Sequence, residues 1–315
     1  MEPRPVVVQT EDLSPAAAAW LGERCNVIVC PYTDPALNVH LARAHALLVR
    51  TYTRVGRDLL ARAPNLRVVA RAGVGLEHID IAACRERGIE VVHTPDANSS
   101  AVAEYVFAML LDALRPRLFL DAAITTERWA KARRELAAVR QLEGLTLGVW
   151  GMGRIGARVA RIGAAMNMRV LYHDLLEIPH DRRHGATPVS REHLLAQSDV
   201  LTLHVDPRPA NHRMISREVL GALKRDVVLV NCARGVIVDT AALAEFLRAN
   251  SRALGLIDVH DSEPFDASYP LLGLPNAHLS PHLAAATHQA HEAMSWVVRD
   301  LWRVLEGQAP EHRAP

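Results

Sequence analysis

Three side chains in the second half of the sequence carry groups that can act on an organic acid: Arg234, Glu263 and His282. A guanidinium offers a planar pair of donors that fits a carboxylate, and a His gains or loses a proton near neutral pH. A Glu beside that His would stabilise the imidazolium. Together the three groups could move a proton and a hydride at a 2-hydroxy or 2-oxo acid. Taken singly, each also has a structural interpretation, as a surface ion pair, a solvated turn residue and a core histidine.

A second chemical signal is the segment LGVWGMGRIG, in which Gly151, Gly153 and Gly156 follow an apolar run and open a helical pattern. The first glycine permits a tight turn, the second lets a pyrophosphate approach the backbone, and the third lets the helix pack on the sheet. The next apolar run ends at Asp174, where a carboxylate would accept hydrogen bonds from an adenosine ribose. The alternative interpretation is an ordinary tight turn with a surface Asp.

Asp174 also favours NAD over NADP. Its carboxylate would repel a ribose 2′-phosphate, and the next residues, Leu175, Leu176 and Glu177, supply no Arg to bind that phosphate. We therefore expect NAD as the cofactor.

The elements that must position these groups are short apolar strands separated by amphipathic helical stretches. Such a rhythm is typical of doubly wound parallel α/β sheets, in which ligands bind at the carboxyl ends of the strands. Arg234 and Asp258 each lie just beyond an apolar run, so we expect the reactive residues to meet at one edge of a sheet. Strands are predicted at residues 6–8, 27–30, 46–49, 68–70 and 89–92, and in a second series at 145–150, 169–172, 200–204, 227–231 and 253–258.

Two long helices are also predicted. Residues 99–114 are apolar nearly all round and follow Asn98, whose side chain and the adjoining serines can cap the helix, so this helix should be buried. Residues 287–306 carry apolar side chains at helical spacing and should form the last helix, which could return to the first domain.

The length of 315 residues is enough for about two domains. Apolar residues make up 50% and charged residues 23%, as in ordinary globular proteins, and the net charge of +1 offers no global field for nucleic acid or an anionic membrane. Four scattered cysteines show no metal-ligand spacing and are expected to be free thiols in a reducing cytoplasm. No secretion signal is recognised, and no run approaches the ~18 apolar residues of a membrane span.

The order of four motifs, GMGRIG, NCARG, DVHDSEP and SPHLAAAT, resembles the D-isomer-specific 2-hydroxyacid dehydrogenase family over nearly the whole chain. The resemblance implies that Arg234 binds the substrate carboxylate and polarises its carbonyl, that His282 donates and accepts the proton, and that Glu263 is its partner. NAD is implied as the cofactor, and Asp258 is expected near the nicotinamide. The residues expected to contact NAD are Gly151, Gly153, Arg154, Ile155, Gly156, Asp174, Val205, Cys232, Ala233 and Asp258.

The same resemblance implies two doubly wound parallel-sheet domains with the active cleft between them. Residues 1–98 and 287–315 would form a flavodoxin-like substrate domain, and residues 99–286 a Rossmann-type NAD domain. The helix at 99–114 matches the dimer-forming region of the family, so a homodimer is expected. The sequence ends soon after the last predicted helix, so the regulatory domain of longer relatives is not expected.

The segments LLVRTYTRV and VVARAGVG resemble substrate loops of D-3-phosphoglycerate dehydrogenases. Backbone amides near a glycine-rich loop could bind a carboxylate, and nearby arginines could neutralise a phosphate. The alternatives are a non-phosphorylated acid, such as glyoxylate or hydroxypyruvate, and a non-enzymatic NAD(H)-sensing protein like the corepressors that share this fold. The candidate substrate-binding residues are Arg50, Arg54, Arg71, Gly73, Val74, Gly75 and Arg234.

Three residues depart from the family pattern. Leu145 stands where a Lys or Arg is common, Asp206 replaces a Pro after His-Val, and His260 replaces an aromatic residue. None of them removes a reactive group. We expect Asp206 to bear on cofactor affinity and His260 on the surroundings of Glu263.

Overall fold

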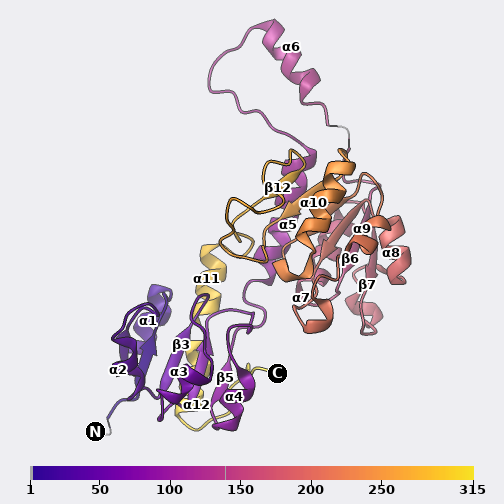
Figure 1. Cartoon of the computed structure of the whole chain (residues 1–315). Coiled ribbons are helices and arrows are strands. Elements are labelled where there is room, and N and C mark those ends of the chain that lie inside the picture. The colour runs from indigo at the N-terminus through magenta and orange to yellow at the C-terminus, as the bar shows by residue number, and fades with distance from the viewer. Residues whose placement is uncertain (1–2, 139) are drawn as a thin grey trace. The chain divides into compact units, whose positions relative to one another are not determined.

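The computed structural model describes residues 3–138 and 140–315 and divides the chain into two compact α/β units (Figure 1). Unit 1 comprises Met1–Asn98 and Ala286–Pro315, and unit 2 comprises Ser99–Ala285. The second crossing between the units therefore falls one residue before the position expected from the sequence. The predicted fold class of two parallel-sheet domains is confirmed.

Unit 1 contains a five-stranded sheet in the order β2-β1-β3-β4-β5, with every neighbouring pair parallel. This is the order of flavodoxin-like doubly wound sheets. The strands are β1 (Val6–Gln9), β2 (Asn26–Val29), β3 (Ala46–Val49), β4 (Val68–Arg71) and β5 (Glu90–Val92). The helices are α1 (Pro15–Gly22), α2 (Leu37–Leu41), α3 (Arg57–Ala61), α4 (Ile81–Glu86), α11 (His288–Ser295) and α12 (Val298–Leu305).

Unit 2 contains a seven-stranded parallel sheet in the order β12-β11-β10-β9-β6-β7-β8, which is the Rossmann order with one further strand. The strands are β6 (Thr146–Trp150), β7 (Arg169–His173), β8 (Thr187–Pro188), β9 (Val200–Leu203), β10 (Val228–Asn231), β11 (Leu254–Ile257) and β12 (Ala277–Leu279). The helices are α5 (Ser99–Leu114), α6 (Thr126–Glu135), α7 (Arg154–Ala165), α8 (Arg191–Gln197), α9 (Arg217–Gly221) and α10 (Thr240–Ala249), with short 3₁₀ turns η1 (His180–Arg182), η2 (Pro209–Asn211) and η3 (Gly235–Ile237).

The ten predicted strands are all present, but β8 and β12 were missed because two or three residues are too few to show a hydrophobic period. Leu145, at the entrance to β6, packs against the apolar core of unit 2. The aliphatic residue at this departure from the family pattern therefore extends the core.

Helix α5 has the predicted bounds, and within one chain only part of its apolar surface is buried. One face, with Val102, Val106 and Leu110, packs into the core of unit 2, whereas Leu111 on another face is 38% exposed. Helix α6 was not predicted, has no buried residue, and lies apart from the sheet in Figure 1.

The predicted single helix over 287–306 is also wrong, because α11 and α12 are separated at Trp296 and Val297. The hydroxyl of Ser295 donates to the His291 carbonyl one turn back and accepts a hydrogen bond from the Ser14 amide. Back-bonding of this kind competes with the helical ladder and bends helices.

Within the described residues, no helix is long and apolar enough to cross a membrane. The four cysteines are free and buried, and the described part of the chain holds no group of three or more side chains arranged to bind a metal ion.

The loop after β3 is held by one carboxylate. Glu11 accepts hydrogen bonds from the backbone amides of Arg50, Thr51, Tyr52 and Thr53 at 2.6–3.2 Å. Burial acts to raise the pKa of the Glu11 carboxyl, but the four backbone donors together outweigh it and lower this pKa. The carboxylate therefore fixes the shape of a loop that carries a candidate substrate residue.

We predict that Glu11→Gln loosens this loop, because an amide nitrogen would face backbone donors. The expected loss is about 1–3 kcal/mol of local stability, measured as faster hydrogen exchange at residues 50–53. The folded-state pKa is lowered, so the stabilisation is present above the ordinary pKa of a Glu and is lost as pH falls through the folded value. Glu23→Gln, which alters an exposed pair with Arg24, is the matched control. Equal exchange at residues 50–53 in both variants would contradict the prediction.

Candidate active site

The reactive side chains lie at the carboxyl ends of three neighbouring strands. Asn231, Ile257 and Leu279 end β10, β11 and β12 and are in register across the sheet. Arg234, Asp258 and His282 follow these ends. The convergence expected for the first two is therefore produced by strand order, and β12, which was not predicted, supplies the position of His282.

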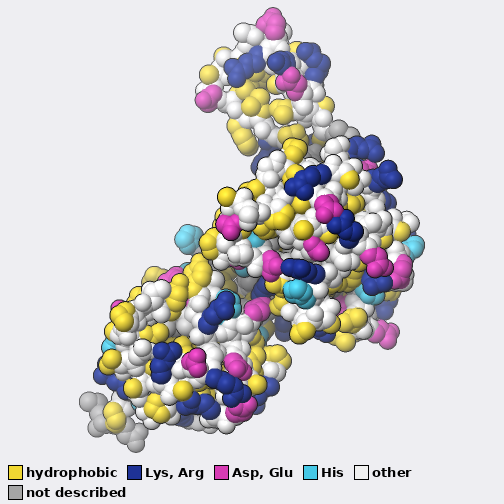
Figure 2. Space-filling model, in the orientation of Figure 1, with side chains coloured by type: hydrophobic (Ala, Val, Ile, Leu, Met, Phe, Trp, Pro, Cys, Tyr) yellow, Lys and Arg dark blue, Asp and Glu magenta, His cyan; other side chains and the backbone are white. Residues whose placement is uncertain are grey.

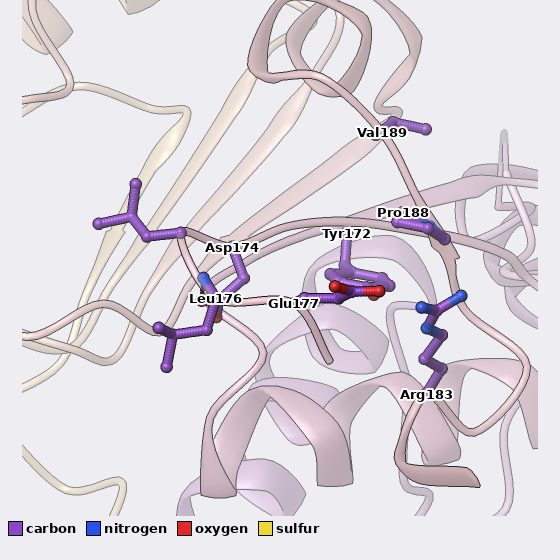
Figure 3. A pocket seen from close by; sticks show the side chains of 8 residues that line it. Tyr172, Asp174, Leu176, Glu177, Arg183, Pro188 and Val189 are labelled. Atoms are coloured by element: carbon purple, nitrogen blue, oxygen red, sulfur yellow. Dashed lines mark hydrogen bonds between the residues drawn. The ribbon is translucent and has the colours of Figure 1, made fainter. Parts of the chain in front are cut away.

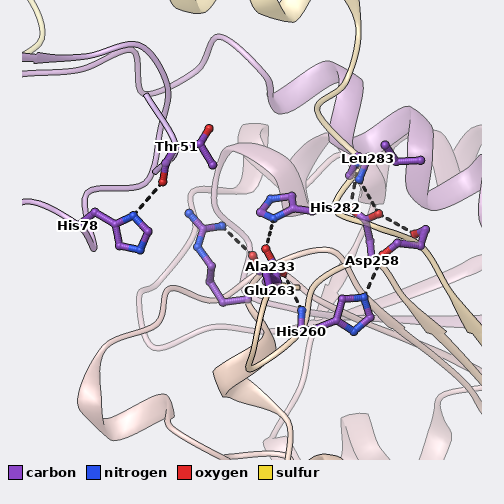
Figure 4. A network of polar contacts seen from close by, with 11 residues as sticks. Thr51, His78, Ala233, Asp258, His260, Glu263, His282 and Leu283 are labelled. Carbon is purple, nitrogen blue, oxygen red and sulfur yellow. Dashed lines mark hydrogen bonds and ion pairs between the residues drawn. The ribbon is translucent and has the colours of Figure 1, made fainter. Parts of the chain in front are cut away.

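Glu263 and His282 form a hydrogen-bonded pair, with 2.7 Å between Oε2 and Nδ1 (Figure 4). The other Glu263 oxygen accepts from the His260 amide at 2.7 Å. Burial acts to raise the pKa of Glu263, but the hydrogen bonds and charges of His282 and His260 outweigh it and lower this pKa. An ionised Glu263 only accepts, so Nδ1 of His282 carries the hydrogen and Nε2 is the nitrogen left to exchange a proton.

Asp258 positions the segment that carries His282. Its side chain is fully buried and accepts from the Ser280 hydroxyl at 2.6 Å and from the amides of Leu283 and Ala284 at 2.8 and 2.9 Å. Its carbonyl accepts from the His282 amide at 2.9 Å. His282 itself has a φ of 55°, a left-handed conformation that persists in a non-glycine residue only where its surroundings enforce it.

Asn231 fixes the turn that carries Arg234. The fully buried Asn231 amide donates to the Arg234 carbonyl at 3.0 Å and accepts from the Ala233 amide at 3.1 Å. Arg234 Nη1 donates to the Ala233 carbonyl at 2.7 Å. Next to it, a Cβ on Gly235 would lie 1.9 Å from the carbonyl carbon of His260, so only glycine lets the two reactive loops approach this closely.

His260 is a structural replacement for an aromatic residue. It is 6% exposed and packs edge-on against Phe265 and Tyr269, with ring centroids 4.6 and 5.2 Å away. Its Nε2 donates to the Ser280 carbonyl at 2.9 Å, and its Nδ1 lies 2.8 Å from the Tyr269 hydroxyl. The ring thus ties the Glu263 loop to the segment before His282.

The glycine turn fits a dinucleotide pyrophosphate. Gly151 has a φ of 95°, and a Cβ on it would lie 2.7 Å from the His204 carbonyl oxygen. A Cβ on Gly156 would lie 2.0 Å from the Gly151 carbonyl oxygen, so α7 packs directly on the turn. Gly153 begins α7 without a side-chain cap and has open space around its Cα, which leaves the helix N-terminus accessible to an anion. Arg154 and Ile155 form the first turn of α7.

Asp174 lies one residue beyond β7, at the mouth of this turn. Its two oxygens accept from the Met152 amide at 2.6 Å and the Leu176 amide at 2.8 Å, and each keeps a lone pair for a further donor. It borders a cavity of about 320 Å³. Figure 3 labels seven of the residues that line this cavity: Tyr172, Asp174, Leu176, Glu177, Arg183, Pro188 and Val189.

Two arginines lie near Asp174 although neither is among the residues that directly follow it in the sequence. Arg183 lines the cavity and donates from Nε to the Ile178 carbonyl, and Arg208 is paired with Asp206. The remaining predicted NAD residues lie close to the turn or the reactive loops. Val205 is next to Gly151, and Cys232, whose pKa is raised by burial, begins the segment before Arg234.

The candidate substrate residues of unit 1 lie at the ends of β3 and β4. Val49 and Arg71 are paired in the sheet, so Arg50 follows directly beside Arg71. A Cβ on Gly73 would lie 1.3 Å from Nη1 of Arg71, which shows that this guanidinium covers the glycine. The Gly73 amide donates to the Arg71 carbonyl at 2.8 Å. Their contact with a substrate stays a prediction, as do the roles of Val74 and Gly75.

Residues 107–284, more than half of the chain, match the family model described as D-isomer specific 2-hydroxyacid dehydrogenase, NAD binding domain. The chain belongs to this family. It is therefore an NAD-dependent 2-hydroxyacid dehydrogenase by family, and the predicted cofactor is confirmed.

Full-length relatives of this dehydrogenase differ in name. The glyoxylate reductase of Aeropyrum pernix is 34% identical over 98% of this chain and 95% of its own length. The D-3-phosphoglycerate dehydrogenase of Mycobacterium bovis is 38% identical over 91% of this chain, which spans only 54% of that protein. The crystal structure of D-lactate dehydrogenase from Aquifex aeolicus, complexed with NAD and lactic acid, matches 96% of each chain with a TM-score of 0.80 and 29% identity.

We predict that Glu263→Gln lowers reductive kcat/KM, because a neutral amide cannot stabilise the positive charge that His282 carries during proton transfer. The acidic limb that reflects protonation of Glu263, whose pKa is lowered, should disappear from the variant. Stopped-flow rates of NADH oxidation across pH would measure both the loss of rate and the loss of this limb. Asp261→Asn, in the same loop and paired only loosely with Arg213 at 3.9 Å, is the control. An unmoved pH profile in the Gln variant would show that Glu263 and His282 do not act as a pair.

Proposed function

We propose that this dehydrogenase reduces a small, non-phosphorylated 2-oxo acid such as glyoxylate or hydroxypyruvate with NADH, and oxidises the corresponding D-2-hydroxy acid. The observation that carries this proposal is the Glu263–His282 pair, which lies with Arg234 at one sheet edge. A paired acid and base next to a carboxylate-binding group is what this reaction requires of a protein.

In the proposed reduction, Arg234 holds the substrate carboxylate with its planar fork and polarises the adjacent carbonyl. NADH, when held by the Gly151–Gly156 turn and Asp174, would supply the hydride to C2. His282, protonated on Nε2, donates a proton to the developing alkoxide oxygen, and Glu263 stabilises the imidazolium before that transfer. In the oxidation, neutral His282 removes the hydroxyl proton. Asp258 and Asn231 act as positioning residues, because their contacts fix the loops rather than reach the reacting atoms.

The charges around Arg50 favour an acid without a phosphate group. Its guanidinium lies 3.2 Å from the Asp12 carboxylate, and its amide is bound by Glu11. A cation already compensated by one carboxylate and next to another is poorly suited to a phosphate dianion. The relative from Aeropyrum pernix, which is similar over 95% of its own length, is named a glyoxylate reductase.

A panel of 2-oxo acids tests the assignment. With NADH as the reductant, kcat/KM should be at least about tenfold higher for glyoxylate or hydroxypyruvate than for 3-phosphohydroxypyruvate. Pyruvate tests whether the site accepts a methyl group. A preference for 3-phosphohydroxypyruvate would overturn the substrate but keep the dehydrogenase. Tight NADH binding with no turnover of any acid would instead favour the NAD(H)-sensing alternative.

We predict that Arg234→Lys raises KM and lowers kcat/KM at least about tenfold, because one charge-assisted hydrogen bond to the carboxylate, worth about 1.5–3 kcal/mol, is lost. Initial rates with the preferred acid measure the effect. Arg213→Lys, an exposed arginine of the same unit, should leave the rates unchanged. Equal KM values for the wild type and Arg234→Lys would show that Arg234 does not bind the acid.

We also propose that the protein is a cytoplasmic homodimer. The free, buried cysteines fit a reducing compartment. The arm formed by residues 115–125 and α6 exposes Leu118, Phe119, Leu120 and Trp129, and Figure 2 shows apolar side chains gathered on one part of this lobe. Exposed apolar clusters of this kind mark interfaces, and a second copy of the chain would cover the arm together with the exposed face of α5.

Light scattering coupled to gel filtration tests the dimer. The wild type should have twice the mass of the 34.6 kDa chain, and Phe119→Asp, at a side chain 81% exposed, should shift the protein towards monomer. Val39→Asp, at a side chain 70% exposed in unit 1, is the matched control and should stay dimeric. A monomeric wild type would overturn the proposal.

A further inference from the structure

The carboxyl ends of β7, β6 and β9 lie side by side and form the mouth of the dinucleotide site. β6 pairs with β7 on one side and with β9 on the other. Asp174 follows β7, and Asp206 follows β9 within a few residues. The Gly151 turn lies between them, since its amide bonds to the His173 carbonyl and its Cα faces the His204 carbonyl. Asp206, a departure from the family pattern, therefore lies at the mouth of this site.

Both carboxylate oxygens of Asp206 accept hydrogen bonds from the guanidinium of Arg208. Arg208 Nε donates to Oδ1 at 2.6 Å and Nη2 donates to Oδ2 at 2.5 Å. The Asn211 side chain also donates to the Asp206 carbonyl at 2.9 Å and to Oδ1 at 3.2 Å. A bidentate contact of this kind occupies the fork that a guanidinium would otherwise offer to a phosphate.

Arg208 is also within the field of Asp174. The hydrogen bonds and charge of Asp206 raise the pKa of the Arg208 guanidinium, and the charge of Asp174 adds to that rise. The charges of two carboxylates, Asp206 and Asp174, therefore act on the Arg208 guanidinium. Arg183, the other arginine nearby, has its Nε directed to the Ile178 carbonyl.

We propose that Asp206 is a specificity-determining residue: by holding Arg208 in a bidentate pair, it withholds this cation from a ribose 2′-phosphate, so Asp206 and Asp174 together set the preference for NADH over NADPH. The inference concerns the dinucleotide site and does not depend on which acid is reduced. It differs from simple repulsion by Asp206, because it requires Arg208 to become a phosphate ligand when the pair is broken.

Adenine nucleotides separate these mechanisms without any turnover. The probes are 5′-AMP and 2′,5′-ADP, which differ by the 2′-phosphate, with Kd values measured by titration calorimetry at low ionic strength because both partners are about half exposed and screened by salt. The ratio of Kd for 2′,5′-ADP to Kd for 5′-AMP reports the discrimination. Asp206→Asn keeps the shape of the side chain and removes its charge.

In Asp206→Asn this ratio should fall about tenfold, equivalent to about 1.4 kcal/mol. In the Arg208→Ala background, the same Asp206→Asn change should lower the ratio less than about threefold, because no guanidinium remains to be released. Equal falls in the two backgrounds would show simple repulsion and overturn the proposal. An unchanged ratio in Asp206→Asn would overturn it as well.

Glu245→Gln is the matched control, because it breaks an exposed carboxylate–arginine pair with Arg217 between α9 and α10. It should leave the ratio unchanged. Thermal unfolding of each variant checks that the loop change has not unfolded the protein. Fluorescence titration with NADH and NADPH should give the same order of discrimination for the whole cofactors. Since no step needs an acid substrate, a failed substrate assignment would leave this test intact.

Discussion

The buried carboxylate of Asp258 is the interaction on which the reactive site depends. A charge without exposure to water is costly unless donors surround it, and here a hydroxyl and two backbone amides do so. All three donors come from residues 280–284, so satisfying the charge also fixes the chain around His282. The left-handed conformation of His282 follows from this constraint. The imidazole is thereby delivered to Glu263 by a segment that has little freedom to move.

The order of the sheet explains why one edge of unit 2 can hold two kinds of chemistry. β9 pairs with both β6 and β10, so the strands of the glycine turn and those of the reactive loops are continuous in a single sheet. All strands are parallel, and their carboxyl ends therefore face the same way. The glycine turn and the Glu263–His282 pair therefore lie at the same edge of this sheet. After β6 the chain adds β7 and β8 on one side of the sheet and then β9 to β12 on the other side. The point between β6 and β9 is therefore the topological switch point, where such sheets bind ligands.

Each residue that departs from the family pattern makes contacts of its own with the surrounding structure. Leu145 joins the apolar core, His260 keeps edge-on packing while adding two polar contacts, and Asp206 replaces the stiffness of a proline with a network to Arg208 and Asn211. Gly235 has no such tolerance, since a Cβ there would enter the backbone of His260. The chain thus departs from the family pattern where a side chain finds new partners, and it is restricted where two backbones touch.

The sequence by itself determined the strand rhythm and the glycine turn with Asp174, and it was enough to predict roles for Arg234, Glu263 and His282, because hydrophobic period, turn chemistry and side-chain chemistry are local properties. It did not show β12, the break between α11 and α12, or the exposed face of α5, since each depends on what packs against it. It also did not show that Arg208 approaches Asp174 or that Asn231 holds the Arg234 turn. Those contacts join residues through strand pairing and loop closure, so only the tertiary structure decides them.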